Sequence, residues 1–328
     1  MIITRAPLRI SFFGGGTDYP EFFEKEGGAV LATAIDKFSY VTASRFFSDL
    51  FDFSVRVSYS KAESARRVEE IEHKVFREAL KLTGFAKDIE LHTVADLPAF
   101  TGLGSSSSFT VALLQSLHAF KGEYLPPLAL AYEAIAVERH RCQDNVGCQD
   151  QVTAAVGGFN LIEFRREDDA RVHPLSLSRQ RLQEFQRHLV LVYTGITRRA
   201  ADMVARQLQV LPNNLETLRQ MRAMAERGWN ILTGNRPLAE FGELLDRAWA
   251  AKRGLESSIS NSEIDRMYAA GREAGALGGK LLGAGGGGFL AFFAPPENHA
   301  RLREVLHPHP ILDIEIGAPG SEIIFSSD

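Results

Sequence analysis

The sequence has 328 residues, of which 45% are hydrophobic and 24% are charged, and its formal net charge is −4. A chain of this length and composition is expected to be globular and to form two domains. The negative charge argues against nucleic acid or an anionic membrane as a partner, and no apolar run reaches the ~18 residues of a membrane span. Two cysteines, Cys142 and Cys148, are too few for a disulfide framework. We therefore expect a cytoplasmic protein, and the sequence leaves a homodimer open.

The first expected element is a strand from Ile2 to Phe13, an apolar, β-branched run that stops at three glycines. The backbone can approach a ligand closely at these glycines, Gly14, Gly15 and Gly16. Thr17 and Asp18 follow, and the Asp18 carboxylate offers two hydrogen-bond acceptors. A plain turn capped by Asp18 explains the same residues equally well. The segment is a candidate ligand site that turn chemistry alone does not decide.

Four more elements are expected before residue 95. The pattern predicts strands over 28–47, 53–60 and 89–94, and a charged amphipathic helix over 62–83. The strand at 89–94 alternates apolar and polar residues and delivers the chain to a glycine-rich loop.

This loop reads Pro-Ala-Phe-Thr-Gly-Leu-Gly-Ser-Ser-Ser-Ser at 98–108, and an apolar run at helical spacing follows from Phe109 to Phe120. Unpaired N–H groups in the first turn of a helix, combined with glycine-rich backbone, form an anion site. A polyphosphate is the expected ligand. A flexible turn with an ordinary serine N-cap explains the loop equally well without a ligand.

Two carboxylates after this helix stand out. A helix predicted from Pro127 to Arg141 places Glu138 on its apolar stripe, although a solvated glutamate paired with Arg139 or Arg141 is the simpler interpretation. Asp150 lies in the first turn of a short helix, where a capping role is the structural alternative.

The remaining elements complete two predicted domains, 1–185 and 186–328. A hairpin over 159–175 closes the first domain, and the second has a strand at 189–193, helices near 200–210, 215–232, 237–254 and 262–274, and strands at 289–294, 311–316 and 322–325. Ser260 and Glu263 are expected to form a capping box.

Several common sites are excluded by their context. Residues 283–288 match G-x-G-x-x-G, but a strand rather than a helix follows, so a dinucleotide fingerprint does not fit. The sequence has no P-loop motif, no His-Arg-Asp and no His-Glu-x-x-His. His307 and His309 flank a proline in a polar loop and are interpreted as surface residues rather than metal ligands.

The three glycine-rich segments and their order resemble the GHMP kinase superfamily. Ala-Pro-Leu-Arg at 6–9 with Gly-Thr-Asp-Tyr at 16–19 matches the first motif of that family. Pro98 with Gly-Leu-Gly-Ser-Ser at 102–106 matches the second, and Lys280 with the glycines at 283–288 matches the third.

Within the superfamily the sequence is most similar to bacterial D-glycero-D-manno-heptose 7-phosphate kinases, over almost the whole chain. Gln-Asp-Gln at 149–151, Gly-Gly-Phe-Asn at 157–160, Ile-Thr-Arg at 196–198 and the run 260–268 carry this likeness. Two departures are present. Gly15-Gly16 stands where galactokinases have Glu-His, which argues against galactose, and Leu282 stands where Ser or Thr is usual.

The resemblance implies an α+β fold with an N-terminal domain like ribosomal protein S5, a ferredoxin-like C-terminal domain and an active site between them. It implies that ATP is the phosphoryl donor and that Mg²⁺ lies between Ser106 and Glu138. Asp150 would orient or deprotonate the acceptor hydroxyl, and Arg9 would stabilise charge. The residues expected to contact the ATP phosphates are Pro98, Gly102, Leu103, Gly104, Ser105, Ser106 and Ser107.

The implied substrate is a small sugar phosphate, a heptose 7-phosphate phosphorylated at its anomeric hydroxyl for surface-glycan synthesis. The residues expected to contact the sugar are Gly14, Gly15, Gly16, Thr17, Asp18, Gly285 and Gly286. Candidates for its distal phosphate are Arg198, Lys252 and Arg253, each of which is also explained as a solvated base. A kinase for another sugar and a non-catalytic sugar or nucleotide sensor are the alternatives.

Overall fold

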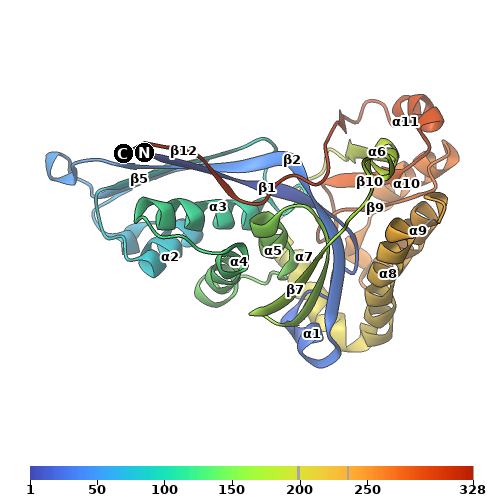
Figure 1. The fold of residues 1–328 in the computed structure, drawn as a ribbon, viewed down its shortest axis with the longest axis horizontal. Helices are drawn as coiled ribbons and strands as arrows, with labels where there is room; N and C mark the ends of the chain where they lie inside the picture. The colour runs from blue at the N-terminus through green and yellow to red at the C-terminus, as the bar shows by residue number, and fades with distance from the viewer. Residues whose placement is uncertain (198–199, 235, 328) are drawn as a thin grey trace.

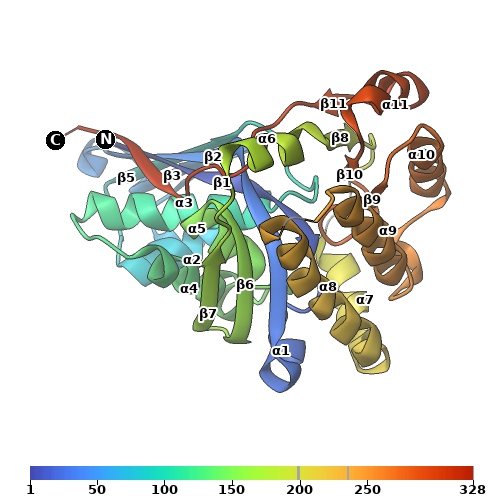
Figure 2. The same ribbon diagram turned by 45° about the vertical axis from the view of Figure 1, so that its right-hand side comes forward.

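The computed structural model describes residues 1–197, 200–234 and 236–327, and two β-sheets organise it (Figure 1). The larger sheet has eight strands and carries helices α2–α5 on one face, whereas the smaller sheet has four strands and packs against α9 and α10 (Figures 1 and 2). The two chain ends lie side by side, because the Met1 amino group donates to the Ser327 carbonyl oxygen at 3.1 Å.

The larger sheet has the strand order β12-β1-β2-β5-β3-β4, with β6 beside β2 and β7 beside β6. Its strands are β1 Ile2–Phe13, β2 Gly28–Arg45, β3 Val55–Ser58, β4 Ala62–Ala65, β5 Ile89–Ala95, β6 Phe159–Arg166, β7 Asp169–Pro174 and β12 Glu322–Ser326. The smaller sheet has the order β11-β8-β10-β9, with β8 Leu189–Tyr193, β9 Gly278–Leu281, β10 Phe289–Phe293 and β11 Ile311–Leu312.

Strand β2 is long enough to pair with three other strands of the larger sheet. Its first part pairs with β6 and its second part with β5, while β1 runs antiparallel along its other edge. Because side chains alternate along a strand, Arg9 and Ser11 in β1 share one face. Strands β1 and β2 therefore contribute apolar side chains to the core and also position polar side chains at one end of the sheet.

Eleven α-helices are present in the described residues. They are α1 Pro20–Glu26, α2 Lys74–Thr83, α3 Ser105–Phe120, α4 Pro127–Ile135, α5 Gln149–Val156, α6 Arg179–Arg187, α7 Ala200–Val210, α8 Leu215–Thr233, α9 Ala239–Arg253, α10 Ser262–Glu273 and α11 His299–Val305. Helix α3 lies against β1 and β2 and buries Val111, Leu114 and Leu117. No helix of the described chain is both long and apolar enough to cross a bilayer.

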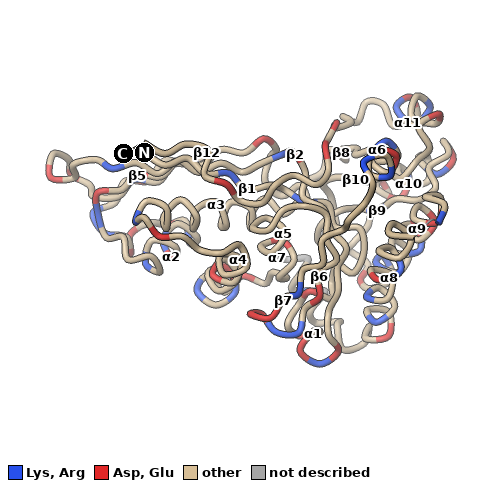
Figure 3. The backbone as a smooth tube through the Cα atoms, in the orientation of Figure 1, with Lys and Arg blue, Asp and Glu red and all other residues tan. Residues whose placement is uncertain are grey.

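A cluster of aromatic rings joins the two halves. The Phe241 ring packs edge-on against the Phe12 and Phe185 rings at centroid distances of 5.4 and 4.9 Å, and Phe185 contacts Phe293 at 5.3 Å. These rings come from β1, α6, α9 and β10, and all are buried. Lysines, arginines and acidic residues are interspersed on the outer helices (Figure 3).

Some sequence predictions differ from the structure. The helix predicted over 62–83 is wrong in its first half, which forms β4 and a 3₁₀ turn before α2. The expected capping box is wrong, because Asn261 caps α10 by accepting from Glu263 N–H at 3.0 Å, while Ser260 Oγ donates to Asp265. The predicted strand 311–316 is only two residues long. The division at residue 185 remains a prediction, and the C-terminal segment crosses it, since β12 joins the larger sheet.

Candidate active site

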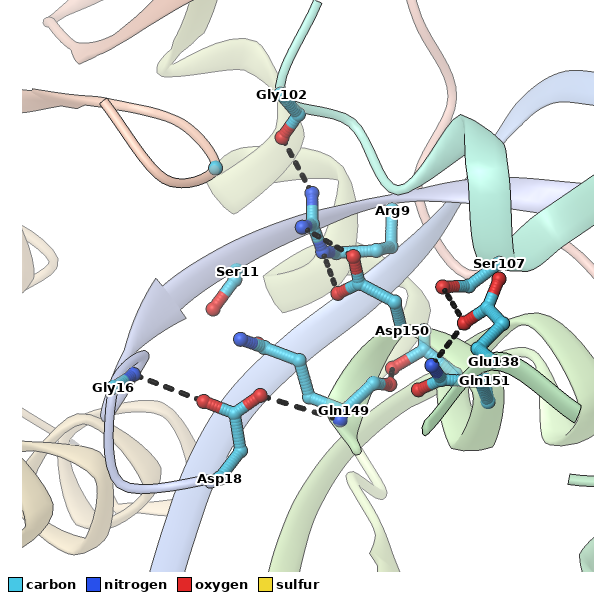
Figure 4. Close-up of polar contacts among 12 residues, drawn as sticks. Arg9, Ser11, Gly16, Asp18, Gly102, Ser107, Glu138, Gln149, Asp150 and Gln151 are labelled. Carbon is cyan, nitrogen blue, oxygen red and sulfur yellow. Dashed lines mark hydrogen bonds and ion pairs between the residues drawn. The ribbon is translucent and has the colours of Figure 1, made fainter. Parts of the chain in front are cut away.

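A bidentate ion pair lies where β1, the loop 98–104 and α5 meet (Figure 4). Arg9 Nε donates to Asp150 Oδ1 at 2.7 Å and Nη2 donates to Oδ2 at 2.9 Å. Arg9 Nη1 donates to the Gly102 carbonyl oxygen at 2.6 Å. The side chains are 6% and 23% exposed, so this charge pair is largely shielded from water. The two oxygens of Asp150 therefore bind Arg9, and Asp150 does not cap the N-terminus of α5.

Helix α3 begins directly beside this pair. Gly104 precedes it with φ +77°, and a Cβ there would lie 3.2 Å from Asp150 Oδ2 and 3.3 Å from Arg9 Cγ. A residue with a side chain would therefore be strained at this position. The first-turn N–H groups of α3 have no intrahelical acceptor. An anion at this helix end would lie next to Arg9 and Asp150.

Glu138 is buried in a π-helical turn, Ala136–Arg141, that continues α4. Its carboxylate accepts hydrogen bonds from Ser107 Oγ at 2.8 Å, from Thr110 Oγ1 at 2.7 Å and from the Gln151 amide. Burial raises the pKa of Glu138 to about 7. The solvated interpretation of Glu138 is therefore wrong, because the side chain is buried and its hydrogen-bond partners among the described residues are neutral.

The surroundings of Glu138 suit a hard cation. Among described residues no group of three His, Cys, Asp or Glu side chains could hold a metal. Mg²⁺, however, is usually held by one or two carboxylates together with substrate phosphates. The buried Gln151 Oε1 beside Glu138 has no partner in the described part of the chain. Ser107, rather than the exposed Ser106, donates to Glu138. A metal role for Ser106 remains a prediction.

Asp18 lies on the other side of the ion pair, buried to 1% exposure. It accepts from Gly16 N–H at 2.9 Å and from Gln149 N–H at 3.3 Å (Figure 4). Burial raises its pKa, since a charged carboxylate is costly away from water. Thr17 Oγ1 instead donates to the Gly14 carbonyl oxygen at 2.8 Å and so fixes the turn.

The third glycine-rich segment packs onto the second. A Cβ on Gly102 would lie 2.4 Å from the Leu282 carbonyl oxygen, and Gly102 has φ +80°. Gly286 N–H donates to the Ile259 carbonyl oxygen at 2.9 Å, and a Cβ on Gly285 would meet Ile259 at 2.9 Å. A substrate contact by Gly285 and Gly286 remains a prediction.

The candidate bases for a distal phosphate differ sharply. Lys252 is buried, and its Nζ donates to the Gly283 carbonyl oxygen. Burial, and then the charge of Arg9, lower the pKa of Lys252 to about 8. Arg253 has other partners: its Nη1 donates a hydrogen bond to Asp265 Oδ1 at 3.1 Å, and its guanidinium lies over the Trp249 ring. Arg198 lies outside the described residues.

Four polar residues at this site had no assigned role in the sequence analysis: Ser11, Thr110, Gln149 and Gln151. Ser11 is two residues beyond Arg9 on the same face of β1, and this spacing was a usable signal. Gln149 and Gln151 flank Asp150 in the motif that carries the family resemblance. Thr110 offered no signal, since its contact with Glu138 depends on how α3 and α4 pack.

Comparison with known proteins identifies the family of this chain. The family described as GHMP kinases N terminal domain matches residues 65–158, and GHMP kinases C terminal matches residues 229–307. A D-glycero-alpha-D-manno-heptose 7-phosphate kinase of Campylobacter jejuni is 30% identical over 93% of both chains. An L-fucokinase/L-fucose-1-P guanylyltransferase of Bacteroides fragilis is 27% identical over 92% of this chain and 35% of its own length.

A solved structure shows the same fold. The crystal structure of a D-glycero-D-manno-heptose 1-phosphate kinase from Bacteroides thetaiotaomicron superimposes with a TM-score of 0.82 at 22% identity and covers all of both chains. The predicted two-domain α+β fold is thereby confirmed. Together with the Campylobacter relative, these matches show that the chain belongs to the GHMP kinase family and is an ATP-dependent sugar kinase.

Proposed function

We propose that this enzyme transfers the γ-phosphoryl group of ATP to the anomeric hydroxyl of D-glycero-D-manno-heptose 7-phosphate, giving the 1,7-bisphosphate. The observation that carries this proposal is the Arg9–Asp150 pair, largely shielded from water, beside the N-terminus of α3. The name of the Campylobacter relative supports the choice of sugar. The product would feed nucleotide-heptose synthesis for surface polysaccharide, a cytoplasmic process.

The ATP phosphates would lie on the loop Gly102–Ser107. The first-turn N–H groups of Ser105, Ser106 and Ser107 point out of a helix end, where the helix dipole favours negative charge. The close packing of Gly102 against Leu282 supports this arrangement, because it holds the loop in one conformation. Pro98 and Leu103 would frame the same loop.

Asp150 would accept the proton of the anomeric hydroxyl as its oxygen attacks the γ-phosphorus. The new bond joins that oxygen to phosphorus, the bond to the β-phosphate oxygen breaks, and ADP leaves with the electron pair. Arg9 would hold the Asp150 carboxylate in place and stabilise charge on the transferred group. Phosphoryl transfer passes through a loose transition state, so positioning and charge stabilisation supply most of the catalysis.

Mg²⁺ would be held by Glu138 and by a serine hydroxyl, from Ser106 or Ser107. When bound, it would neutralise charge on the ATP phosphates. The buried, oxygen-rich surroundings of Glu138 support this role. The hydrogen bonds from Ser107 and Thr110 orient the carboxylate.

The sugar would lie between Asp150 and Asp18, with the backbone of Gly14–Gly16 against it. Its distal phosphate would be bound by Lys252, which is the buried candidate base, whereas Arg253 is already bonded to Asp265. The charged Lys252 Nζ has three N–H donors. One of them donates to the Gly283 carbonyl oxygen, and the other two can donate to a phosphate.

The test is a coupled assay of ADP release over a panel of sugars and sugar phosphates. The panel includes the heptose 7-phosphate, the unphosphorylated heptose, galactose, L-fucose and mevalonate. We expect the heptose 7-phosphate to give the highest kcat/KM and ³¹P NMR to show a new anomeric phosphate. L-Fucose is included because a fucokinase is among the relatives. ADP release that no acceptor stimulates would favour the sensor alternative.

A further inference from the structure

Besides Gln151, two buried polar side chains of the candidate active site end in an atom that has no hydrogen-bond partner among the described residues. Ser11 is 4% exposed and Gln149 is 9% exposed. Ser11 Oγ and Gln149 Oε1 make no hydrogen bond with any described residue. Buried polar atoms in native proteins are almost always hydrogen-bonded, and leaving one unsatisfied destabilises the fold. Their presence here is therefore explained by a ligand that completes them.

The two side chains converge on one point. Ser11 Oγ and Gln149 Nε2 lie 3.5 and 3.6 Å from the position that a Cβ on Gly15 would occupy. Ser11 follows Arg9 on one face of β1, and Gln149 precedes Asp150 in α5. Both side chains thus point into the space between the Arg9–Asp150 pair and Asp18 (Figure 4). The missing side chain of Gly15 keeps this space open.

The backbones of both residues are held by neighbouring side chains. The buried Lys280 donates its Nζ to the carbonyl oxygens of Ser11 and Phe12, at 2.9 and 3.1 Å. Gln149 N–H donates to Asp18 Oδ2, and the Gln149 carbonyl oxygen accepts from Thr153 Oγ1 at 2.8 Å. The backbones are fixed while the ends of both side chains are free, which is the arrangement of a preorganised binding site.

The chemistry of these groups selects the ligand. The Asp18 carboxylate accepts hydrogen bonds, whereas the Ser11 hydroxyl and the Gln149 amide both donate and accept. The ligand must therefore both donate and accept several hydrogen bonds, as neighbouring sugar hydroxyls do and a carboxylate anion does not. We infer that Ser11 and Gln149 bind the hydroxyls next to the phosphorylated one and so select polyhydroxylated acceptors. This inference rests on the proposed sugar kinase activity.

The test compares Ser11→Ala and Gln149→Met with a control on the same strand, Thr4→Val. Thr4 is buried, and its Oγ1 already donates to the Ala112 carbonyl oxygen at 2.7 Å. For Ser11→Ala and Gln149→Met we expect KM for the best acceptor of the screen to rise roughly 3- to 10-fold, the effect of one lost neutral hydrogen bond. KM for ATP should not change.

Thermal unfolding of the ligand-free protein separates a ligand role from a structural one. The Tm of Ser11→Ala should equal or exceed that of the wild type, because no hydrogen bond is lost, whereas Thr4→Val should lower Tm without changing KM. At least one monodeoxy analogue of the acceptor should have a higher KM than the acceptor itself with the wild type, but the same KM as the acceptor with Ser11→Ala.

Two results overturn the inference. One is an unchanged acceptor KM in both variants while the wild type phosphorylates a sugar, which leaves the proposed function intact. The other is a fall in the Tm of Ser11→Ala as large as that of Thr4→Val. A wild-type enzyme that phosphorylates no sugar would overturn this inference and the proposed function together.

Discussion

Asp150 is the side chain on which the proposed chemistry depends most. Asp150→Asn keeps the shape of the residue but removes its charge and its capacity to take a proton. We expect kcat to fall by about 10²- to 10⁴-fold, with KM for ATP retained, which is the usual size of general-base effects. Asp168→Asn, at an aspartate whose side chain is 76% exposed, is the matched control. An unchanged kcat together with a lowered Tm in Asp150→Asn would show that the role of Asp150 is structural.

Glu138 combines burial with a proposed metal role. Burial raises its pKa to about 7, so the ionised carboxylate is disfavoured in the metal-free fold. Glu138→Gln removes this cost, and Tm at pH 8 without metal should therefore not fall. Activity should require more Mg²⁺, since a hard cation prefers anionic oxygen ligands. Titrating Mg²⁺ against rate measures the effect, and an unaltered Mg²⁺ dependence would remove Glu138 from the metal site.

The lowered pKa of Lys252 predicts that KM for the sugar phosphate depends on pH. Its pKa is lowered to about 8, so it is a cation below that pH and neutral above it. The charged groups that act on it are Arg9, Asp18 and Asp150, and burial, followed by the charge of Lys252, lowers the pKa of the neighbouring Lys280. If Lys252 binds the distal phosphate, KM for the sugar phosphate should rise as pH increases from 7 to 9, whereas KM for the unphosphorylated sugar should not follow that trend.

The neighbouring base on α9 provides the control for Lys252. Lys252→Met should raise KM for the sugar phosphate by roughly 10- to 100-fold and remove its pH dependence. Arg253→Met should do neither, because Arg253 is bonded to Asp265. Equal effects of the two substitutions would contradict the assignment.

At the scale of elements, the contact between two glycine-rich loops fixes the phosphate site. Gly102→Ala would place a Cβ 2.4 Å from the Leu282 carbonyl oxygen at φ +80°. Gly122→Ala carries a similar backbone cost at φ +74°, but nothing lies within 4 Å of its Cβ. We expect Gly102→Ala to lower Tm further than Gly122→Ala and to raise KM for ATP. Similar Tm values and an unchanged KM would show that the loops need no close contact.

The elements with strong periodicity were predictable from the sequence. Strand β1 was predicted with its observed bounds, because its apolar run ends at glycines. The stretch 62–83 was mistaken for one helix because Glu63 is charged but points inward. Its carboxylate accepts from Tyr59 Oη at 2.8 Å and from Glu72 N–H at 2.5 Å, which folds the segment into a turn. Hydrogen bonds of this kind, from a buried carboxylate to a nearby hydroxyl and backbone N–H, leave no periodic trace in the sequence.

The site was predictable in part for the same reason. Charged residues at unusual positions identified Glu138 and Asp150 as candidates. Their alternatives stayed open, because the partner of Asp150 is Arg9, on another element. Ser11 and Gln149 gained significance only from burial without partners, a property of the folded chain.

At the scale of the whole molecule, the aromatic cluster and the C-terminal strand tie the halves together. Phe12 and Phe185 pack against Phe241, and β12 crosses back to pair with β1. The strand that carries Arg9 and Ser11 is thus held by both sheets. We infer that the catalytic pair depends on the integrity of this junction.

The most direct test of the account is kcat/KM for D-glycero-D-manno-heptose with and without its 7-phosphate, measured with saturating ATP and Mg²⁺. The account predicts that the 7-phosphate raises kcat/KM by roughly 10- to 100-fold, the contribution of one charge-assisted hydrogen bond. The product should carry its new phosphate on the anomeric oxygen. Equal values for the two sugars, or a clear preference for galactose or mevalonate, would contradict the heptose assignment.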